Sequence, residues 1–588
     1  MNDNRNMLLA IVLSALVLIG WSFLGDRYFP TSTEDDVSIV EASPNDIPDA
    51  GPLATPVPGE DALPTQAPAA AEPAAPRPAD DIIADGGRIA IDTPSVDGSI
   101  NLTGARFDDL MLKRHRTELD GEEEVRLLSP AGSDSAYFAQ YGWTGDGVEV
   151  PGTDTVWTAD GDTLTPDQPV TLTWSNETGQ TFIQTISVDD NYLFTIDQRV
   201  ENRSGNAVAI RPYALASRAE RSTDKSFWTV HVGPMGVFDD AADYDVGYDE
   251  LEEAGPAGER RTTTGGWLGF TDKYWLTALV PDQGSQVTAT MRQSASGAFQ
   301  TDYIGAPVIL QPNQASTFSA RLYAGAKEKG LLDSYEAAGI PKLSKSIDWG
   351  WFEWFMRPIF DLLRFLFQQT GNFGVAIILM TVLVRFVLYP LANKQFRSMA
   401  GMRRIQPKMK ALQERYKDDK QRLQQEMLKL YQEEKLNPAA GCLPIFLQIP
   451  IFYALYKVLL VSVEMRHQPF ALWLTDLSAP DPLTPVNLFG LLPFTPPSMI
   501  AIGVLPILLG ITMWLQFKLN PAPMDPVQKQ VFGIMPWILM FVMAPFAAGL
   551  QLYWVVSNIL TIAQQKYLYH KYDLEKDGAK AGVTRTGG

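Results

Sequence analysis

The chain has few of the residues that most often build catalytic and metal sites. Its 588 residues include one cysteine, Cys442, and four histidines. A single cysteine excludes an intramolecular disulfide framework. His115 and His231 are isolated from other potential ligands, which is typical of structural or surface histidines. His-Glu-x-x-His, Gly-x-Gly-x-x-Gly and Walker motifs are missing from the sequence. We therefore expect that the protein is not an enzyme and that it binds no metal and no cofactor.

Basic residues are scarce in the first part of the chain. Residues 26–345 hold 51 Asp and Glu against 23 Lys and Arg, a net charge of −28. The remainder holds 17 acids and 25 bases, a net of +8, and the two parts sum to the −20 of the whole chain. An acidic soluble part is therefore joined to a basic, hydrophobic part. No direct function on nucleic acid is expected of the acidic part.

The N-terminal region predicts an anchor and a spacer. Met7 to Leu24 is apolar and long enough to cross a bilayer of about 30 Å. No A-x-A site follows it, and Trp21 and Phe23 are typical of an interfacial belt, which favours an uncleaved anchor over a cleaved signal peptide. We assign residues 1–25 to this anchor and 26–80 to a flexible linker rich in Pro and Ala.

Short alternating segments follow, rich in β-branched and aromatic residues and separated by Gly, Asp and Asn. Examples are RIAI, VTLTWSN, FIQTISVDD, YLFTIDQRVEN, WLTALV and STFSARLYAG. This pattern predicts one large β-sandwich domain over residues 81–340. It contains no convincing carboxylate pair, so we interpret it as a non-enzymatic interaction module.

Residues 341–370 combine many aromatics with regularly spaced charges. Five tryptophan and phenylalanine residues lie between Trp349 and Phe355, and charges recur from Asp348 to Arg364. The charges are too many for a membrane span, so we predict an amphipathic helix in the membrane interface. A core helix of the β-domain is the alternative.

The rest of the sequence predicts a multi-pass α-helical membrane protein. We expect five transmembrane helices, at residues 371–390, 438–463, 498–519, 531–547 and 549–568. Between them lie a polar segment at 391–437, loops at 464–497 and 520–530, and a tail at 569–588. The polar segment has apolar residues at helical three-four spacing, interrupted near Lys417, which predicts a coiled-coil hairpin.

Charge fixes the expected topology. The hairpin at 391–437 carries 12 Lys and Arg against 6 Asp and Glu, including Arg403, Arg404, Lys408, Lys410, Arg415 and Lys417. The positive-inside rule therefore places it in the cytoplasm. Counting spans from the anchor gives the same result, with both termini cytoplasmic and the β-domain outside.

Arg385 is the least expected residue of the predicted spans. A charge at bilayer depth costs about 2.5–3.5 kcal/mol on insertion scales, so it commonly marks a functional site. Thr381 lies one turn before Arg385 on the same predicted span, and the other spans contain the neutral polar residues Gln448, Thr512, Gln516, Gln551, Asn558 and Thr561, with Trp554 on the same stripe as the last three. One alternative is that Arg385 snorkels to the cytoplasmic interface. The other is a water-filled cavity open to the cytoplasm, in which these polar residues solvate it.

The order of these features resembles the YidC insertase family (the YidC/Oxa/Alb group) in its Gram-negative form. The matching stretches run from VRFVLYPLANKQFRSM through NPAAGCLPIFLQIPIFYALYKVL to FALWLTDLSAPDP, LPILLGITMWLQ and GLQLYWVVSNILTIAQQ. The resemblance is strong over residues 345–570 and weaker over the anchor and the β-domain. The segment VNLFGLLPFTPPSMIAIG is longer than is usual in the family.

The resemblance implies a fold, a function and a site. The fold is an anchor plus a five-helix core with a hydrophilic groove open to cytoplasm and lipid, and a periplasmic supersandwich. The function is insertion and folding of inner-membrane proteins, independently or with the Sec translocon. Arg385 takes the place of the groove arginine, and Phe452, Leu508 and Val542 take the substrate-sliding positions. Thr381 and Trp554 fall near the groove top, where the family often has Tyr in place of Trp554.

The implied partners are nascent membrane proteins, the ribosome, the Sec translocon with its associated subunits, and membrane lipids. The implied location is the bacterial inner membrane. Two other functions remain open, a transporter or channel and an envelope sensor or scaffold. Transporters usually show internal repeats, and none is recognisable here. A sensor would depend on the β-domain as its receptor.

Overall fold

A computed structural model describes most of the protein from residue 76 onwards. The described residues are 76–119, 121–224, 230–417, 419–434, 443–489, 491–492, 494, 501–519 and 526–583. The predicted anchor at 1–25 and most of the predicted linker at 26–80 lie outside these residues.

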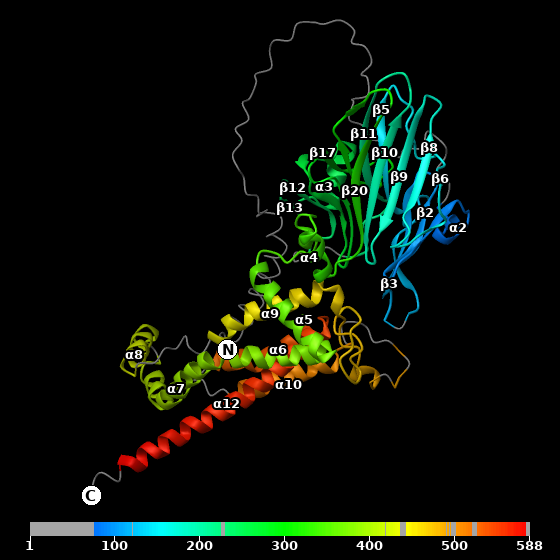
Figure 1. Ribbon diagram of the computed structural model, residues 1–588. Coiled ribbons are helices and arrows are strands. Elements are labelled where there is room, and N and C mark those ends of the chain that lie inside the picture. The colour runs from blue at the N-terminus through cyan, green and yellow to red at the C-terminus, as the bar shows by residue number, and fades with distance from the viewer. Residues whose placement is uncertain are drawn as a thin grey trace, which may run out of the picture. The chain divides into compact units, whose positions relative to one another are not determined.

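The β-rich part is built on two large sheets (Figure 1). Within the described residues the first sheet has eleven strands, in the order β14-β17-β18-β11-β5-β3-β2-β1-β7, with β19 beside β11 and β4 beside β3. Its bounds are β1 (Arg88–Asp92), β2 (Val96–Asn101), β3 (Arg106–Arg116), β4 (Glu124–Leu128), β5 (Tyr137–Asp146), β7 (Thr163–Leu164), β11 (Val208–Arg218), β14 (Glu259–Thr264), β17 (Gln286–Gln293), β18 (Phe299–Gly305) and β19 (Val308–Leu310).

The second sheet has nine strands among the described residues, in the order β13-β12-β15-β16-β20-β10-β9-β8-β6. Its bounds are β6 (Thr158–Ala159), β8 (Val170–Ser175), β9 (Gln180–Val188), β10 (Leu193–Asn202), β12 (Gly233–Phe238), β13 (Ala241–Asp243), β15 (Trp267–Thr271), β16 (Trp275–Val280) and β20 (Gln314–Ala326). Of the strand pairs described in both sheets, β1–β7 is parallel and the others are antiparallel.

The two sheets pack face to face through aromatic side chains. Trp143 of β5 lies 5.2 Å from Phe182 of β9, measured between ring centroids. Phe107 of β3 meets Phe194 of β10 edge to face at 5.4 Å. Along β9 every second residue is buried, as expected of a strand with one face against a core. The strand-like stretches RIAI, VTLTWSN and WLTALV fall on β1, β8 and β16.

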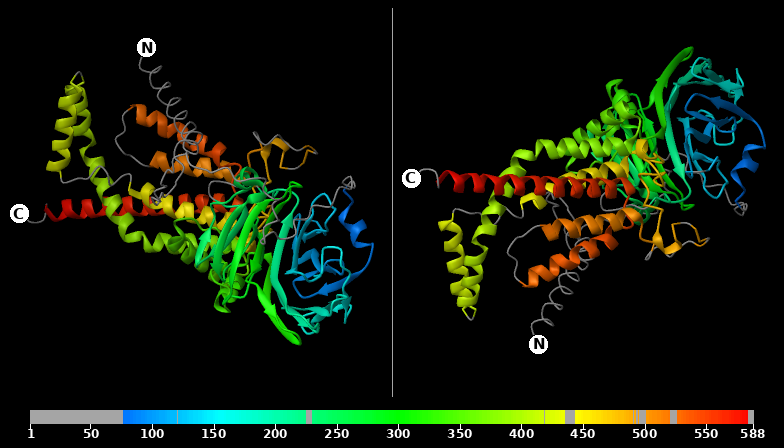
Figure 2. Two further views of the ribbon diagram at one scale, coloured as in Figure 1. Left: turned by 90° about the horizontal axis from the view of Figure 1, so that it is seen from above. Right: turned by 90° about the horizontal axis from the view of Figure 1, so that it is seen from below.

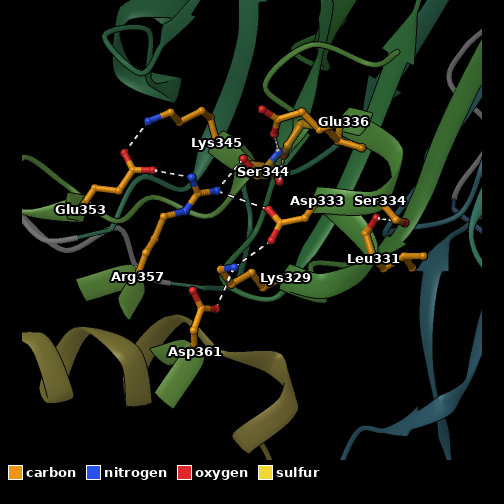
Figure 3. A network of polar contacts seen from close by, with 12 residues as sticks. Lys329, Leu331, Asp333, Ser334, Glu336, Ser344, Lys345, Glu353, Arg357 and Asp361 are labelled. Atoms are coloured by element: carbon orange, nitrogen blue, oxygen red, sulfur yellow. Dashed lines mark hydrogen bonds and ion pairs between the residues drawn. The ribbon is translucent and has the colours of Figure 1, made fainter. Parts of the chain in front are cut away.

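Short helices accompany the sheets: α2 (Ala79–Ile83), α3 (Tyr248–Ala254), η1 (Gly255–Ala257), α4 (Lys329–Ala337) and η2 (Leu343–Ser346). A network of ion pairs joins the last two to helix α5 (Glu353–Thr370) (Figure 3). Lys329 of α4 pairs with Asp333 at 2.7 Å and with Asp361 of α5 at 2.9 Å. Arg357 of α5 donates to the Ser344 hydroxyl of η2 at 2.8 Å. The end of the β-rich part is thus held to α5 by charged contacts.

Helix α5 begins at Glu353, well inside the stretch 341–370 that the sequence predicts as one amphipathic helix. Asp348 and Gly350 form a turn before it, with the Gly350 N–H donating to the Asp348 carboxylate at 2.8 Å and Gly350 at φ 70°. Met356 and Phe360 are buried, whereas Trp354 is 71% exposed. One face of α5 therefore packs and the other carries bare aromatics, as an amphipathic helix requires.

The remaining helices form the C-terminal part. Their bounds are α6 (Phe373–Val387), α7 (Tyr389–Arg415), α8 (Lys420–Glu433), α9 (Leu443–Val461), α10 (Val504–Leu519), α11 (Pro526–Met543) and α12 (Ala548–Val583), with the short turns η4 (Val463–Met465) and η5 (Pro485–Asn487). Helix α12 contacts α6, α9 and α10 (Figure 1), and α10 also contacts α11. Helices α7 and α8 pack against each other as a hairpin (Figure 2).

One segment between α9 and α10 ties three helix N-termini together. Asn372, the N-cap of α6, donates its side-chain amide to the Phe470 carbonyl at 2.8 Å. The Ala548 N–H at the start of α12 donates to the Ala479 carbonyl at 2.7 Å, and the Leu505 N–H of α10 donates to the Asp481 carboxylate at 2.7 Å. Helices α6, α10 and α12 therefore begin at the same end of the bundle.

Candidate functional site

Arg385 lies in the last turn of α6. The helix starts cleanly because Gly371 ends α5 at φ 67° and the Asn372 side chain accepts a hydrogen bond from the Val375 N–H at 3.0 Å. It ends at Val387, where the backbone bends by 57° into α7. Pro390 in the first turn of α7 explains the break, since proline is tolerated at a helix start but clashes with a preceding helical turn.

The guanidinium of Arg385 contacts α12. Its Nη2 donates to the Ser557 hydroxyl at 2.5 Å and to the Ser557 carbonyl at 3.2 Å. Ser557 is itself buried. Within the described residues no carboxylate pairs with Arg385. The Arg385 side chain thus points into the helix bundle. Both of its described acceptors are neutral and belong to Ser557.

A cavity of about 420 Å³ opens at this position. It lies among α6, α7, α9, α10, α11 and α12 and has two kinds of lining. Its polar side chains are Arg385, Gln395, Gln448, Gln516, Ser557, Asn558 and Thr561. Its other lining residues are mostly apolar, including Phe452, Met513 and Trp554. The cavity can therefore accommodate a polar segment and an apolar one side by side.

Hydrogen bonds hold several of the polar side chains in place. Gln448 donates its amide to the Tyr553 hydroxyl at 2.6 Å, which connects α9 to α12. Asn558 donates to the Thr512 hydroxyl at 3.2 Å, which connects α12 to α10. The Phe452 ring packs on Trp554 at 4.8 Å between centroids. These contacts give the cavity defined walls.

Two family models match the sequence, "YidC periplasmic domain" over residues 88–362 and "60Kd inner membrane protein" over residues 365–576. A protein of Zymomonas mobilis subsp. mobilis named membrane protein insertase YidC is 44% identical over 582 residues, which cover 98% of this chain and 97% of the relative. A protein of the same name from Rhizobium meliloti is 44% identical over 573 residues, covering 96% of this chain and 95% of the relative.

The chain belongs to the YidC family of membrane protein insertases. Membership implies an inner-membrane protein with a periplasmic domain, and the relatives' names indicate no catalytic activity. A solved structure of an active YidC insertase, with its first transmembrane domain resolved, is 19% identical with a TM-score of 0.35, over 81% of this chain and 92% of that one.

Length and hydropathy together decide whether a helix could span a membrane. Among the described residues no single helix is both long enough and apolar enough, whereas α6 with the first part of α7 meets the criterion as a bent pair. Shorter apolar helices cover Gln448–Val461, Val504–Leu519 and Gln530–Met543.

The structure gathers many of the site residues predicted from the sequence around one cavity. Those that line it are Arg385, Gln448, Phe452, Gln516, Trp554, Asn558 and Thr561. Thr512 is next to it, bonded to Asn558. Leu508 and Val542 do not line it and are 38% and 53% exposed on α10 and α11.

Two predicted residues have local partners outside the cavity. Thr381 is buried and donates its hydroxyl to the Ile377 carbonyl of its own helix at 2.6 Å. Gln551 is buried and donates its amide to the carbonyls of Met543 and Phe546, both at 2.8 Å. Gln551 of α12 therefore holds the connection between α11 and α12 by hydrogen bonds.

Sequence reasoning missed Ser557, the residue that holds Arg385. It lies three residues after Trp554 and four before Thr561, so helical three-four spacing places it on the same stripe. It also missed Tyr553, which is buried and accepts from Gln448.

The predicted cytoplasmic hairpin corresponds to α7 and α8. Ile405, Met409 and Leu430 form its small core. Lys408 pairs with Glu434 at 2.6 Å, and the Arg415 guanidinium lies 5.6 Å from the centroid of the neighbouring Tyr416 ring. Lys408, Lys410, Arg415 and Lys417 are exposed. The side chains of Arg403 and Arg404 lie outside the described residues.

The histidines of the β-rich part have structural surroundings. His115 packs edge to face on Trp275 at 5.1 Å, and a ring nitrogen of His231 lies 2.8 Å from the Pro234 carbonyl. Burial lowers the pKa of His231. Among the described residues no group of three or more His, Cys, Asp or Glu side chains is arranged to hold a metal ion.

Proposed function

We propose that the protein inserts integral inner-membrane proteins by receiving the polar outer segment of a client in the cavity beside Arg385. We call this cavity the groove, defined by Arg385, Gln448, Phe452, Gln516, Trp554 and Asn558. The observation that carries the proposal is the neutral environment of Arg385, whose described partners are the hydroxyl and carbonyl of Ser557. An arginine whose partners among the described residues include no carboxylate is available to a polar or acidic segment of another protein.

The proposed topology has six spans, the anchor predicted at residues 1–25 followed by α6, α9, α10, α11 and α12, with both termini cytoplasmic and the β-rich part periplasmic. The common end of α6, α10 and α12 supports this arrangement, because helices that begin together cross in the same direction. The loop at 464–497 contains one Lys or Arg, Arg466, against 12 in the hairpin at 391–437. The positive-inside rule then assigns the hairpin to the cytoplasm and the loop to the outside.

The groove acts by lowering the cost of moving polar groups into the bilayer. A hydrogen-bonding group transferred into hydrocarbon without a partner costs roughly 2–7 kcal/mol. Arg385 and the amides of Gln448 and Gln516 offer partners at that depth. The positive charge adds attraction for acidic residues, and the membrane potential assists their outward movement.

The apolar part of the client leaves the groove sideways into lipid. Phe452 lies on the groove wall, and the exposed side chains of Leu508 and Val542 lie on α10 and α11. An apolar helix can move along these residues without losing contact with an apolar surface. The polar segment is retained near Arg385 until it crosses.

The remaining parts have accessory roles in this proposal. The exposed basic residues of the hairpin α7–α8 receive the nascent polypeptide or the ribosome at the cytoplasmic face. The Sec translocon and its associated subunits are the further partners, for clients that need both. The β-rich domain acts as an interaction module without an enzymatic role.

Reconstitution tests the proposal. The purified protein in proteoliposomes is supplied with a single-span client, and insertion is measured by protection of the client from added protease. We expect Arg385→Ala to lower the insertion rate. Arg203→Ala, which removes an arginine that is 72% exposed in the β-rich domain, is the matched control and should insert at the parental rate.

Solute flux through the same vesicles separates this function from a transporter or channel. Flux that requires Arg385 while insertion does not would contradict the insertase assignment of the groove. If the Arg385→Ala and Arg203→Ala proteins insert the client at equal rates, the alternative is favoured in which the Arg385 side chain snorkels to the cytoplasmic interface.

A further inference from the structure

The loop before α10 has a composition unlike that of a solvated surface loop. From Pro482 to Phe517 the sequence contains no Asp, Glu, Lys, Arg or His. The first part of this stretch precedes α10, where the described residues form turns and the short helix η5. Loops in water are normally polar, since they run over the protein surface. We call the described residues 484–489, 491, 492 and 494 of this stretch the apolar loop.

Most of the described residues of the apolar loop have large apolar side chains, and these side chains are exposed. The exposed fractions are 40% for Val486, 53% for Leu488, 53% for Phe489, 80% for Leu491, 40% for Leu492 and 48% for Phe494. Leu488 and Phe489 also have positive φ angles of 51° and 59°, which bulky residues seldom adopt. Contiguous exposed apolar groups of this kind mark an interaction surface.

The backbone of the apolar loop supplies its own hydrogen-bond partners. The N–H groups of Leu488, Phe489 and Leu492 donate to the carbonyls of Pro485, Thr484 and Asn487 at 3.0, 3.0 and 3.1 Å. Those of Leu491 and Phe494 donate to carbonyls of Leu488 and Leu492 at 3.3 and 2.9 Å. A loop in water can leave these groups to solvent, whereas a loop in an apolar environment cannot.

The base of the apolar loop is fastened to the outer end of the bundle. The Val504 N–H donates to the Leu483 carbonyl at 3.0 Å, which closes the loop at its two ends. Asp481 is 6% exposed and accepts from the Trp473 indole at 2.9 Å and from the Leu505 N–H at 2.7 Å. The loop therefore leaves the bundle at the level of the first turn of α10.

That level lies close to the hydrocarbon in the proposed topology. Lys518 is the charged residue at the cytoplasmic end of α10, and Val504 is about 21 Å from it along the helix axis at 1.5 Å per residue. A hydrocarbon core is about 30 Å thick, so several ångströms remain on the outer side. The exposed face of α10, with Ile511 and Trp514, continues towards the loop.

We propose that the apolar loop lies in the outer leaflet of the lipid bilayer, with its leucine and phenylalanine side chains among the acyl chains. It thereby continues the lipid-facing surface of α10 to the outer interface. Trp351, just before α5, and Trp354, in the first turn of α5, are 83% and 71% exposed and provide the headgroup-level contacts of the same leaflet. The inference rests on the proposed topology.

Depth-dependent quenching tests it in the full-length protein. The single cysteine is replaced by Cys442→Ser, and Leu491→Cys carries an environment-sensitive fluorophore. The protein is reconstituted in vesicles of phosphatidylethanolamine and phosphatidylglycerol, with or without phosphatidylcholine brominated near the glycerol end of its acyl chains. We expect about twofold quenching by the brominated lipid, because a group in the interfacial zone touches the upper acyl region.

Two matched labels separate failure of this inference from failure of the topology. Ile511→Cys, on the exposed face of α10, should be quenched, whereas Ile309→Cys, 63% exposed on a strand of the β-rich domain, should not. An unquenched label at 491 beside a quenched label at 511 would overturn the inference and indicate water or a protein partner at the loop. An unquenched label at 511 would overturn the topology itself.

A second variant tests the same inference with the fluorophore at a different position of the loop. Leu488→Asp with Leu491→Asp introduces charges that disfavour burial among acyl chains, and a fluorophore at Phe494→Cys reports the position of the loop. We expect the quenching at 494 to fall to near that of the label at 309. Unchanged quenching at 494 would contradict the loop's insertion through these side chains.

Discussion

The charge of Arg385 should couple directly to an acidic residue in the translocated segment of a client. Two unit charges about 6 Å apart at an effective dielectric constant of about 20 interact by about 3 kcal/mol. Losing this interaction in the rate-limiting state slows insertion by about 100-fold. Arg385→Ala should therefore slow an acidic client by that order and its Asp→Asn counterpart much less.

Arg385→Lys should keep more activity than Arg385→Ala because it keeps the charge. The ammonium ion replaces a guanidinium that donates to both the hydroxyl and the carbonyl of Ser557. Loss of one such bond to a charged group costs about 1.5 kcal/mol, or roughly a tenfold lower rate. Equal losses in the Lys and Ala variants would point to a specific guanidinium contact in place of a charge effect.

A double-mutant cycle measures this coupling. Initial insertion rates are compared for the parental, Lys and Ala proteins, each with the acidic and the neutral client, in proteoliposomes without a membrane potential. A coupling near 3 kcal/mol supports the account. If the two clients lose the same factor in Arg385→Ala, the coupling is zero and the electrostatic role of the groove is refuted.

Three further predictions follow from the contacts described. Ser557→Ala should slow acidic clients by roughly tenfold, since a hydrogen bond to a charged group contributes about 1.5 kcal/mol, whereas Ser334→Ala should not, because the Ser334 hydroxyl donates to the Leu331 carbonyl within α4, away from the cavity. Deletion of residues 81–326 should leave most insertion activity in the proteoliposome assay, and complete loss would instead identify the β-rich domain as an essential receptor. Burial lowers the pKa of Lys327 to about 8 from its usual 10.5, so unfolding between these pH values takes up a proton and stability rises with pH. Thermal unfolding of the full-length protein in detergent should show this rise in the parental protein and a smaller one in Lys327→Met, and equal slopes would contradict it.

The sequence was most informative where a pattern repeats. Alternation in stretches such as VTLTWSN fell on strands, and the three-four spacing of Trp554, Asn558 and Thr561 put them on one wall of the cavity. Residues three or four apart lie on the same face of a helix, so the spacing alone places these three side chains together.

Sequence reasoning failed where a side chain's partner is decided by tertiary contacts. Gln551 fits the polar stripe of α12, yet it bonds to carbonyls that the tight connection from α11 leaves without helical partners. Thr381 lies one turn from Arg385 but donates within its own helix. Ser557 went unnoticed because serine in a helix is usually unremarkable, and only the approach of α6 gives it a charged neighbour.

Helix ends were also difficult to predict. The amphipathic helix α5 starts at Glu353, after the turn at Asp348 and Gly350, although the aromatic residues begin before that turn. Composition does not reveal where such a turn interrupts an otherwise continuous apolar pattern. Helix α12 runs to Val583, beyond the apolar residues that suggested an end at 568.

Photo-crosslinking to a stalled nascent membrane protein tests the central claim most directly. A photoreactive residue at Gln516 faces the groove, and one at Leu383, which is 46% exposed and about 200° around α6 from Arg385, provides the matched control. The account predicts adducts between Gln516 and the polar segment of the client, and few from Leu383. Adducts that form from Leu383 and not from Gln516 would contradict it.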